Sequence, residues 1–157
     1  MKVGQYCKRP VVSISEKAEV LEAARLMRDR HIGFIVVIDE DDPLRKPSGV
    51  LTDRDLVLQV MAREVDPRDL VVKDVMTRQP MTASESDDVG DLMQGLRLAG
   101  IRRVPVVDTR GSLTGVIAVD DVVDLVAGLL GDIAGSVKNE QRREWSSRRD
   151  LGRTGDR

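Results

Sequence analysis

The chain has 157 residues, of which 41% are hydrophobic and 2% aromatic, and its formal net charge is −2. A chain of this length can bury one core, or two small units that share one, so two large independent domains are excluded. The weak negative charge gives no general attraction to nucleic acid or anionic membranes, and one cysteine with one histidine cannot supply a disulfide framework or a conventional zinc site.

Taken in chain order, the apolar patterns alternate between strand and helix. Short β-branched runs predict strands, and apolar residues three and four positions apart predict amphipathic helices. Gly33 and Gly100 follow two of these helices and are expected to end them. Strands are expected at residues 11–14, 34–38, 104–107 and 115–119, and helices at residues 19–30, 53–62, 88–99 and 120–130.

The composition changes after residue 131. Residues 132–149 can form a further helix, and the Gly-rich residues 151–157 are expected to fray. Residues 138–157 carry seven basic and four acidic side chains, and the interspersed acids favour a solvated helix over a nucleic-acid-binding arm. No apolar run suggests a leader or a membrane span, so the expected location is the cytoplasm.

The chain contains an internal repeat. Shifted by 69 residues, positions 12–16 lie over 81–85 and positions 32–39 lie over 101–108. Beyond a loop that is three residues longer in the first copy, positions 49–55 match 115–121 at a shift of 66. We therefore predict one repeat at residues 1–62, a linker at 63–69, a second repeat at 70–131 and a basic tail at 132–157. Each copy is too small to bury enough surface for a stable fold alone, so the two are expected to pack together.

A hydroxyl and a carboxylate three positions apart follow the strand that precedes the helix at 53–62. Thr52 and Asp55 lie where a strand becomes a helix, and the N–H groups of a first helical turn favour anions. Thr-x-x-Asp is also the pattern of a helix-capping box, which would make both side chains structural. In the second copy Ala118 replaces the capping residue while Asp121 is retained. A ligand role accounts for both aspartates together, although an acid that only stabilises the helix dipole remains the alternative.

These motifs resemble those of the CBS (cystathionine-β-synthase-type) domain family. Gly49-Val50-Leu51-Thr52-Asp53-Arg54-Asp55 resembles the family's Gly-h-x-Thr-x-x-Asp signature, and residues 101–108 resemble its second-strand segment. The resemblance covers about residues 1–131. It implies a mixed α/β (α+β) fold of two β-α-β-β-α repeats about a pseudo-two-fold axis, followed here by the C-terminal helical tail.

The resemblance also implies two clefts between the repeats that bind adenosyl ligands such as AMP, ADP, ATP or S-adenosylmethionine. Carried over position by position, the preferred cleft would use Thr52, Asp55, Thr82, Ala83, Ile101 and Arg102. The second would use Asp121, Arg103, Ile14, Ile32 and Gly33, and Ala118 predicts weaker or no binding there. Arg102 and Arg103 would reach ligand phosphates, or else form surface ion pairs at the entrance of a strand.

The sequence contains no nucleophile–base pair, metal cluster or glycine-rich phosphate loop, so we expect no catalysis, no metal and no required cofactor. The first functional hypothesis is a regulatory module that senses an adenine nucleotide and signals to an effector protein. The alternative is a ligand-free scaffold that forms a homodimer through apolar faces of the CBS helices, among them Val122, Leu125, Val126 and Leu129, with the tail contacting a partner. Those residues could equally be ordinary core.

Overall fold

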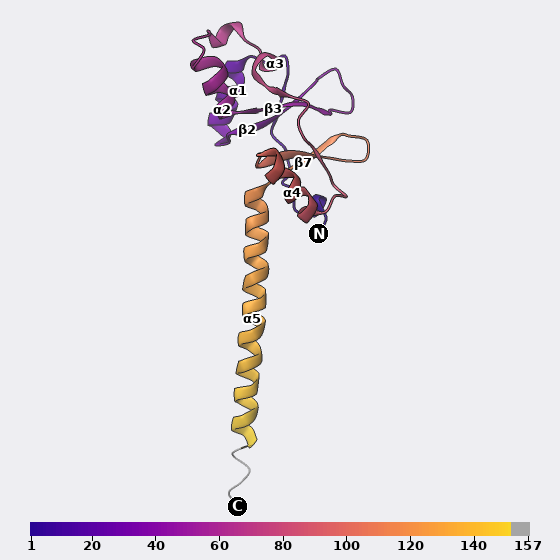
Figure 1. The fold of residues 1–157 in the computed structure, drawn as a ribbon, viewed down its shortest axis with the longest axis vertical. Helices are drawn as coiled ribbons and strands as arrows, with labels where there is room; N and C mark the ends of the chain where they lie inside the picture. The colour runs from indigo at the N-terminus through magenta and orange to yellow at the C-terminus, as the bar shows by residue number, and fades with distance from the viewer. Residues whose placement is uncertain (152–157) are drawn as a thin grey trace, which may run out of the picture. The chain divides into compact units, whose positions relative to one another are not determined.

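The computed structural model describes the backbone of residues 1–151 and the side chains of residues 1–143. It forms two compact units, one from Met1 to Val119 and one that begins at Asp120. The first unit holds two β-sheets and several helices (Figure 1). The strands are β1 (Ser13–Ser15), β2 (Phe34–Ile38), β3 (Pro47–Thr52) and β4 (Thr77–Arg78) in the first sheet, and β5 (Ala83–Ser84), β6 (Arg103–Val107) and β7 (Leu113–Ala118) in the second.

Two equivalent helices, α1 (Val20–Arg30) and α4 (Val89–Ala99), connect the first and second strands of each repeat. Each buries one apolar stripe at helical spacing, which removes those side chains from water and stabilises the unit. The stripes are Val20, Ala23 and Met27 on α1, and Val89, Leu92 and Leu96 on α4. The shorter segments are η1 (Val3–Gln5), α2 (Asp53–Leu56), the π-helical turn η2 (Val57–Met61) that continues it, η3 (Pro67–Asp69) and α3 (Val72–Val75).

The two repeats have the same strand pairing and the same register. β1 runs parallel to β2, which runs antiparallel to β3, and β5, β6 and β7 pair in the same way. Ile14 lies opposite Val37, and Ala83, 69 positions later, lies opposite Val106. Both hairpins shift register at the equivalent step, after Val37 and after Val106. The predicted α+β fold built from two repeats is therefore confirmed.

The first nine residues of each repeat pack against the other repeat. We call residues 1–9 the N-terminal arm and residues 70–78 the linking arm. The N-terminal arm bonds to the second repeat, where the Val3 N–H donates to the Asp87 carbonyl at 3.0 Å, and Lys8 bridges to Val116. The linking arm bonds to the first repeat through equivalent positions, where the Val72 N–H donates to the Ala18 carbonyl at 2.8 Å. This reciprocal exchange ties the repeats into one unit, as a pseudo-two-fold relation requires.

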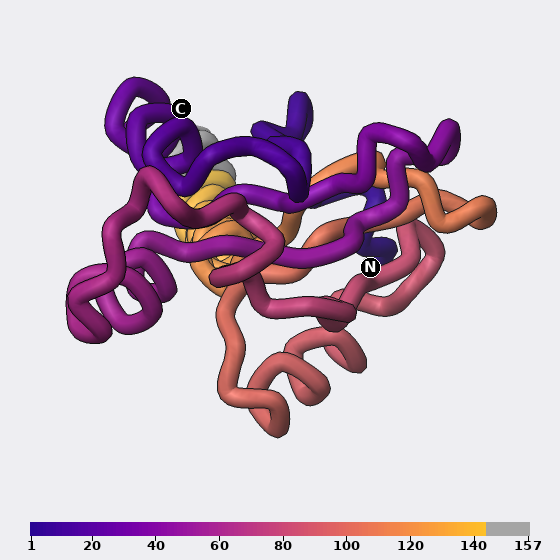
Figure 2. The backbone as a smooth tube through the Cα atoms, turned by 90° about the horizontal axis from the view of Figure 1, so that it is seen from above, coloured from indigo at the N-terminus to yellow at the C-terminus, as the bar shows by residue number. Residues whose placement is uncertain are grey.

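The two hairpin loops also lie side by side, at the edge where β2 turns into β3 and β6 turns into β7 (Figure 2). The Leu113 N–H donates to the Arg45 carbonyl at 3.4 Å. The side chain of Lys46 lies beside Gly111, where an added Cβ would meet it at 3.3 Å. The three-residue insertion in the first copy is therefore accommodated in a surface loop that contacts the second.

Several element ends differ from the sequence-based expectation. Gly33 does not end α1, because His31 takes the left-handed conformation at φ 53° and caps that helix instead. Gly100 ends α4 at φ 67°, as predicted. The linker contains the helical turn η3 rather than only irregular chain, and the sequence did not predict α3 or β4 at all.

The last helix, α5 (Val119–Leu151), is one continuous element that joins the predicted helix at 120–130 to the predicted tail helix. The expected fraying of residues 151–157 concerns positions that, from Gly152 onward, lie outside the described residues. None of the helices within residues 1–151 combines the length and the apolar character needed to cross a membrane.

Candidate functional site

Thr52 and Asp55 interact with each other where β3 passes into α2. Thr52 is extended, at φ −115° and ψ 159°, and its hydroxyl oxygen accepts the Asp55 N–H at 3.1 Å. Asp55 Oδ2 accepts the Thr52 N–H at 2.8 Å and the Thr52 hydroxyl at 2.7 Å. The two residues therefore form the capping box that the sequence left open as an alternative to a ligand site.

The capping box uses only one oxygen of the Asp55 carboxylate. Both hydrogen bonds that the Asp55 side chain accepts end on Oδ2. Within the described residues, none ends on Oδ1. Asp55 is half-buried and lines a cavity of about 510 Å³. Because each carboxylate oxygen can accept two hydrogen bonds, the box fixes the orientation of the carboxylate and leaves Oδ1 available to a ligand.

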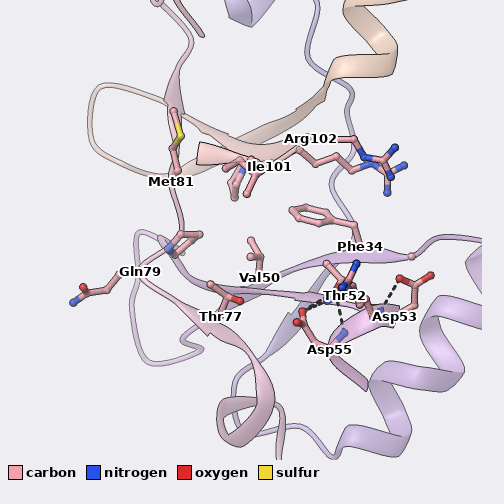
Figure 3. A pocket seen from close by; sticks show the side chains of 16 residues that line it. Phe34, Val50, Thr52, Asp53, Asp55, Thr77, Gln79, Met81, Ile101 and Arg102 are labelled. Carbon is pink, nitrogen blue, oxygen red and sulfur yellow. Dashed lines mark hydrogen bonds between the residues drawn. The ribbon is translucent and has the colours of Figure 1, made fainter. Parts of the chain in front are cut away.

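The cavity lies between the two repeats of the first unit and draws its walls from both (Figure 3). One side comes from the first repeat, from residues 33–34, 50 and 52–55, and another comes from the second repeat, from residues 100–103 and 105. Residues 77 and 79–81, at the end of the linking arm and just after it, complete the lining. In Figure 3, Ile101 and Arg102 lie on the side of the cavity opposite Thr52 and Asp55.

The lining combines an apolar part with a charged part. Phe34, Val50 and Ile101 contribute apolar surface, and Phe34 projects into the space between the two sides (Figure 3). The charged side chains are three arginines and two aspartates, a formal net charge of +1. Such a cavity can hold a flat apolar group at one part and an anion at another, since arginine pairs strongly with phosphate oxygens. The charged residues are Asp53, Arg54, Asp55, Arg102 and Arg103.

Four of the six residues predicted for the preferred cleft line this cavity: Thr52, Asp55, Ile101 and Arg102. The other two do not. Ala83 is 1% exposed and belongs to the packed interior, because its side chain lies on the buried face of β5. Thr82 is exposed and lies outside the cavity lining.

Two residues predicted for the second cleft, Gly33 and Arg103, line this same cavity. Ile14 is 6% exposed in the hydrophobic core of the first repeat, and Ile32 packs against that core. Asp121 lies in the first turn of α5, in the compact unit that begins at Asp120. The second cleft therefore stays a prediction.

Phe34, Asp53 and Arg54 also line the cavity and were not predicted from the sequence. Gly33 gives the clearest signal for two of them, since a Cβ at that position would lie 2.6 Å from Asp53 Oδ2. The Asp53 N–H also donates to the Gly33 carbonyl at 3.2 Å, so the start of β2 and the start of α2 meet there. The glycine between helix and strand marks this close approach and places Phe34, the next residue, at the cavity.

The fold and the inter-repeat cavity define a tandem CBS module. The family model of the CBS domain matches residues 3–62 and 72–128, one match for each repeat. The chain therefore belongs to the CBS domain family, and the resemblance inferred from the signature motif is confirmed.

Two curated relatives and one solved structure illustrate the likeness. "Uncharacterized protein MK0525" of Methanopyrus kandleri is 30% identical over 141 residues, which cover 90% of this chain and 70% of the relative. The "CBS domain-containing protein YhcV" of Bacillus subtilis is 30% identical over 112 residues, 71% of this chain and 76% of the relative. The structure of CBS domain protein PAE2072 from Pyrobaculum aerophilum complexed with AMP has a TM-score of 0.69 and 30% identity, and the match covers 77% of this chain and 89% of that one.

Proposed function

We propose that this chain is a non-catalytic regulatory module that binds an adenine nucleotide, of the AMP, ADP or ATP type, in the cavity between its two repeats. The observation that carries the proposal is the cavity of about 510 Å³ in which Asp55 of the first repeat lies opposite Ile101 and Arg102 of the second. The likeness to a CBS domain protein complexed with AMP, at 30% identity, supports the same ligand class.

Each part of the nucleotide has a matching part of the cavity. Asp55 Oδ1 can accept hydrogen bonds from the ribose hydroxyls, because the capping box already holds the carboxylate in position. Phe34, Val50 and Ile101 offer apolar surface to the base. Arg102, with Arg54 and Arg103, supplies positive charge to the phosphates.

Binding between the repeats gives the module a way to report occupancy. A ligand that contacts both repeats stabilises the arrangement in which both contacts are made, by as much as it binds that arrangement more tightly than others. The nucleotide would thereby change the chain's affinity for an effector protein or for a second copy of itself in the cytoplasm. S-Adenosylmethionine is a further candidate ligand for the same cavity, because it has the same ribose and base as the adenine nucleotides.

Isothermal titration of the full chain with AMP, ADP, ATP and S-adenosylmethionine tests the proposal. Asp55→Asn should weaken nucleotide binding about tenfold or more, because hydrogen bonds to a charged group contribute roughly 1.5–3 kcal/mol. The matched control is Asp74→Asn. Asp74 also accepts the N–H three residues before it, from Val71 at 2.9 Å, but lies outside the cavity lining. The proposal would be refuted if titration with all four ligands released no heat, or if Asp55→Asn and Asp74→Asn lost the same affinity.

Arg102→Gln separates phosphate recognition from base recognition. It should lower the affinity for AMP by about tenfold while leaving the affinity for adenosine nearly unchanged, since only the phosphate pairs with the guanidinium. Equal weakening of AMP and adenosine would place Arg102 in a structural role instead.

A ligand-free dimerisation scaffold is the second candidate, and one surface favours it. The π-helical turn η2 and the chain after it expose large apolar side chains, of which Met61 is 71% and Val57 50% exposed. Apolar exposure on this scale is typical of a partner surface, and CBS helices in the predicted homodimer would provide it. Met61→Asp should then shift the full chain from dimer to monomer in light scattering, whether or not AMP is present. Dimerisation that requires AMP would favour the sensor.

A further inference from the structure

Helix α5 carries an apolar stripe that continues beyond the CBS repeat. Val123, Val126, Leu130, Ile133 and Val137 are each between 44% and 62% exposed. With Val119 at the start of the helix, they follow one another at alternating steps of four and three residues, the spacing of a coiled-coil seam. The family match ends at residue 128, so Leu130, Ile133 and Val137 lie beyond the CBS repeat. We call these six residues the α5 seam.

The helix has little intrinsic stability of its own. Gly128, Gly131 and Gly135 lie within it, and an added Cβ at each would meet nothing within 4 Å. A glycine in the interior of a helix costs about 1 kcal/mol relative to alanine, so three of them weaken an unsupported helix considerably. Helical stability in proteins comes mainly from packing of the apolar face. We therefore expect another apolar surface to pack against the α5 seam.

The seam is symmetric about residue 128. Val126 and Leu130 lie two positions to either side, Val123 and Ile133 five, and Val119 and Val137 nine. If a second α5 lay antiparallel on the first with a two-fold axis at residue 128, every seam residue would meet a seam residue at its own level. Such self-complementarity is what a two-fold symmetric contact requires.

Charge along α5 favours the same antiparallel arrangement. Residues 120–132 contain four aspartates and no basic residue, whereas residues 138–143 contain Lys138, Arg142 and Arg143 against the single acid Glu140. With the axis at residue 128, Lys138 of one copy lies about two residues from the level of Asp120 of the other, Asp124 lies at the level of Asp132, and the helix dipoles oppose. Two parallel copies would align acid with acid and base with base.

From the seam, its symmetry and its charge we infer that α5 forms an antiparallel pair with α5 of a second copy of this chain, centred on residue 128. Val123 of one copy then meets Ile133 of the other, and Val126 meets Leu130. The contact is independent of the cavity between the repeats, so it survives if nucleotide binding is disproved.

Disulfide cross-linking in the full chain tests the pairing, in a Cys7→Ser background that removes the native thiol. Val123→Cys mixed with Ile133→Cys should give the mixed disulfide about tenfold in excess over either self-disulfide, because pairing brings these two thiols to one level. The two copies of residue 123 would lie ten residues apart along the helix axis, about 15 Å, which is too far for a disulfide between them. Intact-mass spectrometry distinguishes the three products.

Two further variants control for unfolding and for charge. Leu130→Asp, added to both cysteine chains, should lower the mixed disulfide at least tenfold by burying a carboxylate in the seam. Gly128→Asp adds the same carboxylate on the opposite face, where there is open space, and should leave the yield unchanged. Self-disulfides in excess would show a parallel pair, and no disulfide in any mixture would show that another partner covers the seam. Either result overturns the inference.

Discussion

The N-terminal arm and the linking arm make the same backbone contacts with different side chains. The Gly4 N–H donates to the Glu85 carbonyl at 3.0 Å, and the equivalent Lys73 N–H donates to the Glu16 carbonyl at 2.9 Å. Beyond these bonds the arms diverge. Backbone hydrogen bonds do not depend on the side chain, so duplication preserved them, while the side chains became free to differ in how firmly each arm is held.

The packing of each arm against a glycine should have the largest effect on stability in both repeats. A Cβ on Gly115 would lie 2.6 Å from Cys7 Sγ, and one on Gly49 would overlap Met76 Sδ. Gly115→Ala and Gly49→Ala should each destabilise the chain by about 1–3 kcal/mol in urea denaturation, because an added methyl group overpacks a filled contact.

Second-site changes test each contact. Cys7→Ala should recover part of the loss from Gly115→Ala, because it removes the sulfur but leaves the Cβ of residue 7 at 3.0 Å from the new Cβ. Met76→Ala should likewise recover part of the loss from Gly49→Ala, since the Thr77 carbonyl oxygen remains 3.0 Å from the new Cβ. The single variants complete two double-mutant cycles. A Cys7→Ala change that rescues nothing would mean that the N-terminal arm does not pack on Gly115.

Equivalent glutamates hold the two arms with different strength. Glu16 pairs with Lys73 of the linking arm and its side chain is 9% exposed, while Glu85 pairs with Arg9 of the N-terminal arm and is 39% exposed. Glu16→Gln should cost about 1–2 kcal/mol, because it leaves a buried site without its charge-assisted hydrogen bond. Glu85→Gln should cost less than about 1 kcal/mol, as is usual for exposed ion pairs. Urea denaturation at pH 7 measures both.

The acid dependence of stability tests the Glu16 contact separately. The hydrogen bond from Lys73 holds the pKa of Glu16 below its usual 4.5 despite burial. A lowered pKa in the folded chain stabilises it at neutral pH, and this contribution is lost as the pH falls below 4.5 and through the folded value. The difference in unfolding free energy between wild type and Glu16→Gln should therefore shrink between pH 5 and pH 3. A difference that stays constant over this range would contradict the assignment.

The repeat and its strands could be predicted because both signals are local. A β-branched apolar run identified β2, helical spacing identified the stripes of α1 and α4, and the shift of 69 residues identified the second copy. The exchange of arms could not be found in this way. The sequence contains equivalent positions such as Val3 and Val72, but which repeat each one packs against depends on contacts between residues far apart in the chain.

The candidate site was predictable only where the family motif covers it. Thr52 and Asp55 carry the signature, whereas Phe34 and Asp53 enter the cavity because β2 and α2 approach each other at Gly33. The assignment of Ala83 to the cavity lining followed from position alone, and the pleat of β5 turns that side chain into the interior. One position along a strand decides which face a side chain takes.

The ends of α1 and α4 should give the smallest difference between the repeats. Both helices close with the same bond pattern, in which the N–H of the cap residue donates to the carbonyl three positions earlier at 3.3 Å. The cap residue is His31 at φ 53° on α1 and Gly100 at φ 67° on α4. A left-handed conformation costs a residue with a Cβ roughly 1 kcal/mol, and glycine avoids this cost. His31→Gly should therefore stabilise the chain by about 0.5–1 kcal/mol and Gly100→Ala should destabilise it by a similar amount, since open space around Gly100 leaves only the backbone effect. Changes of the same sign in urea denaturation would show that the His31 side chain contributes more to the first repeat than its backbone strain costs.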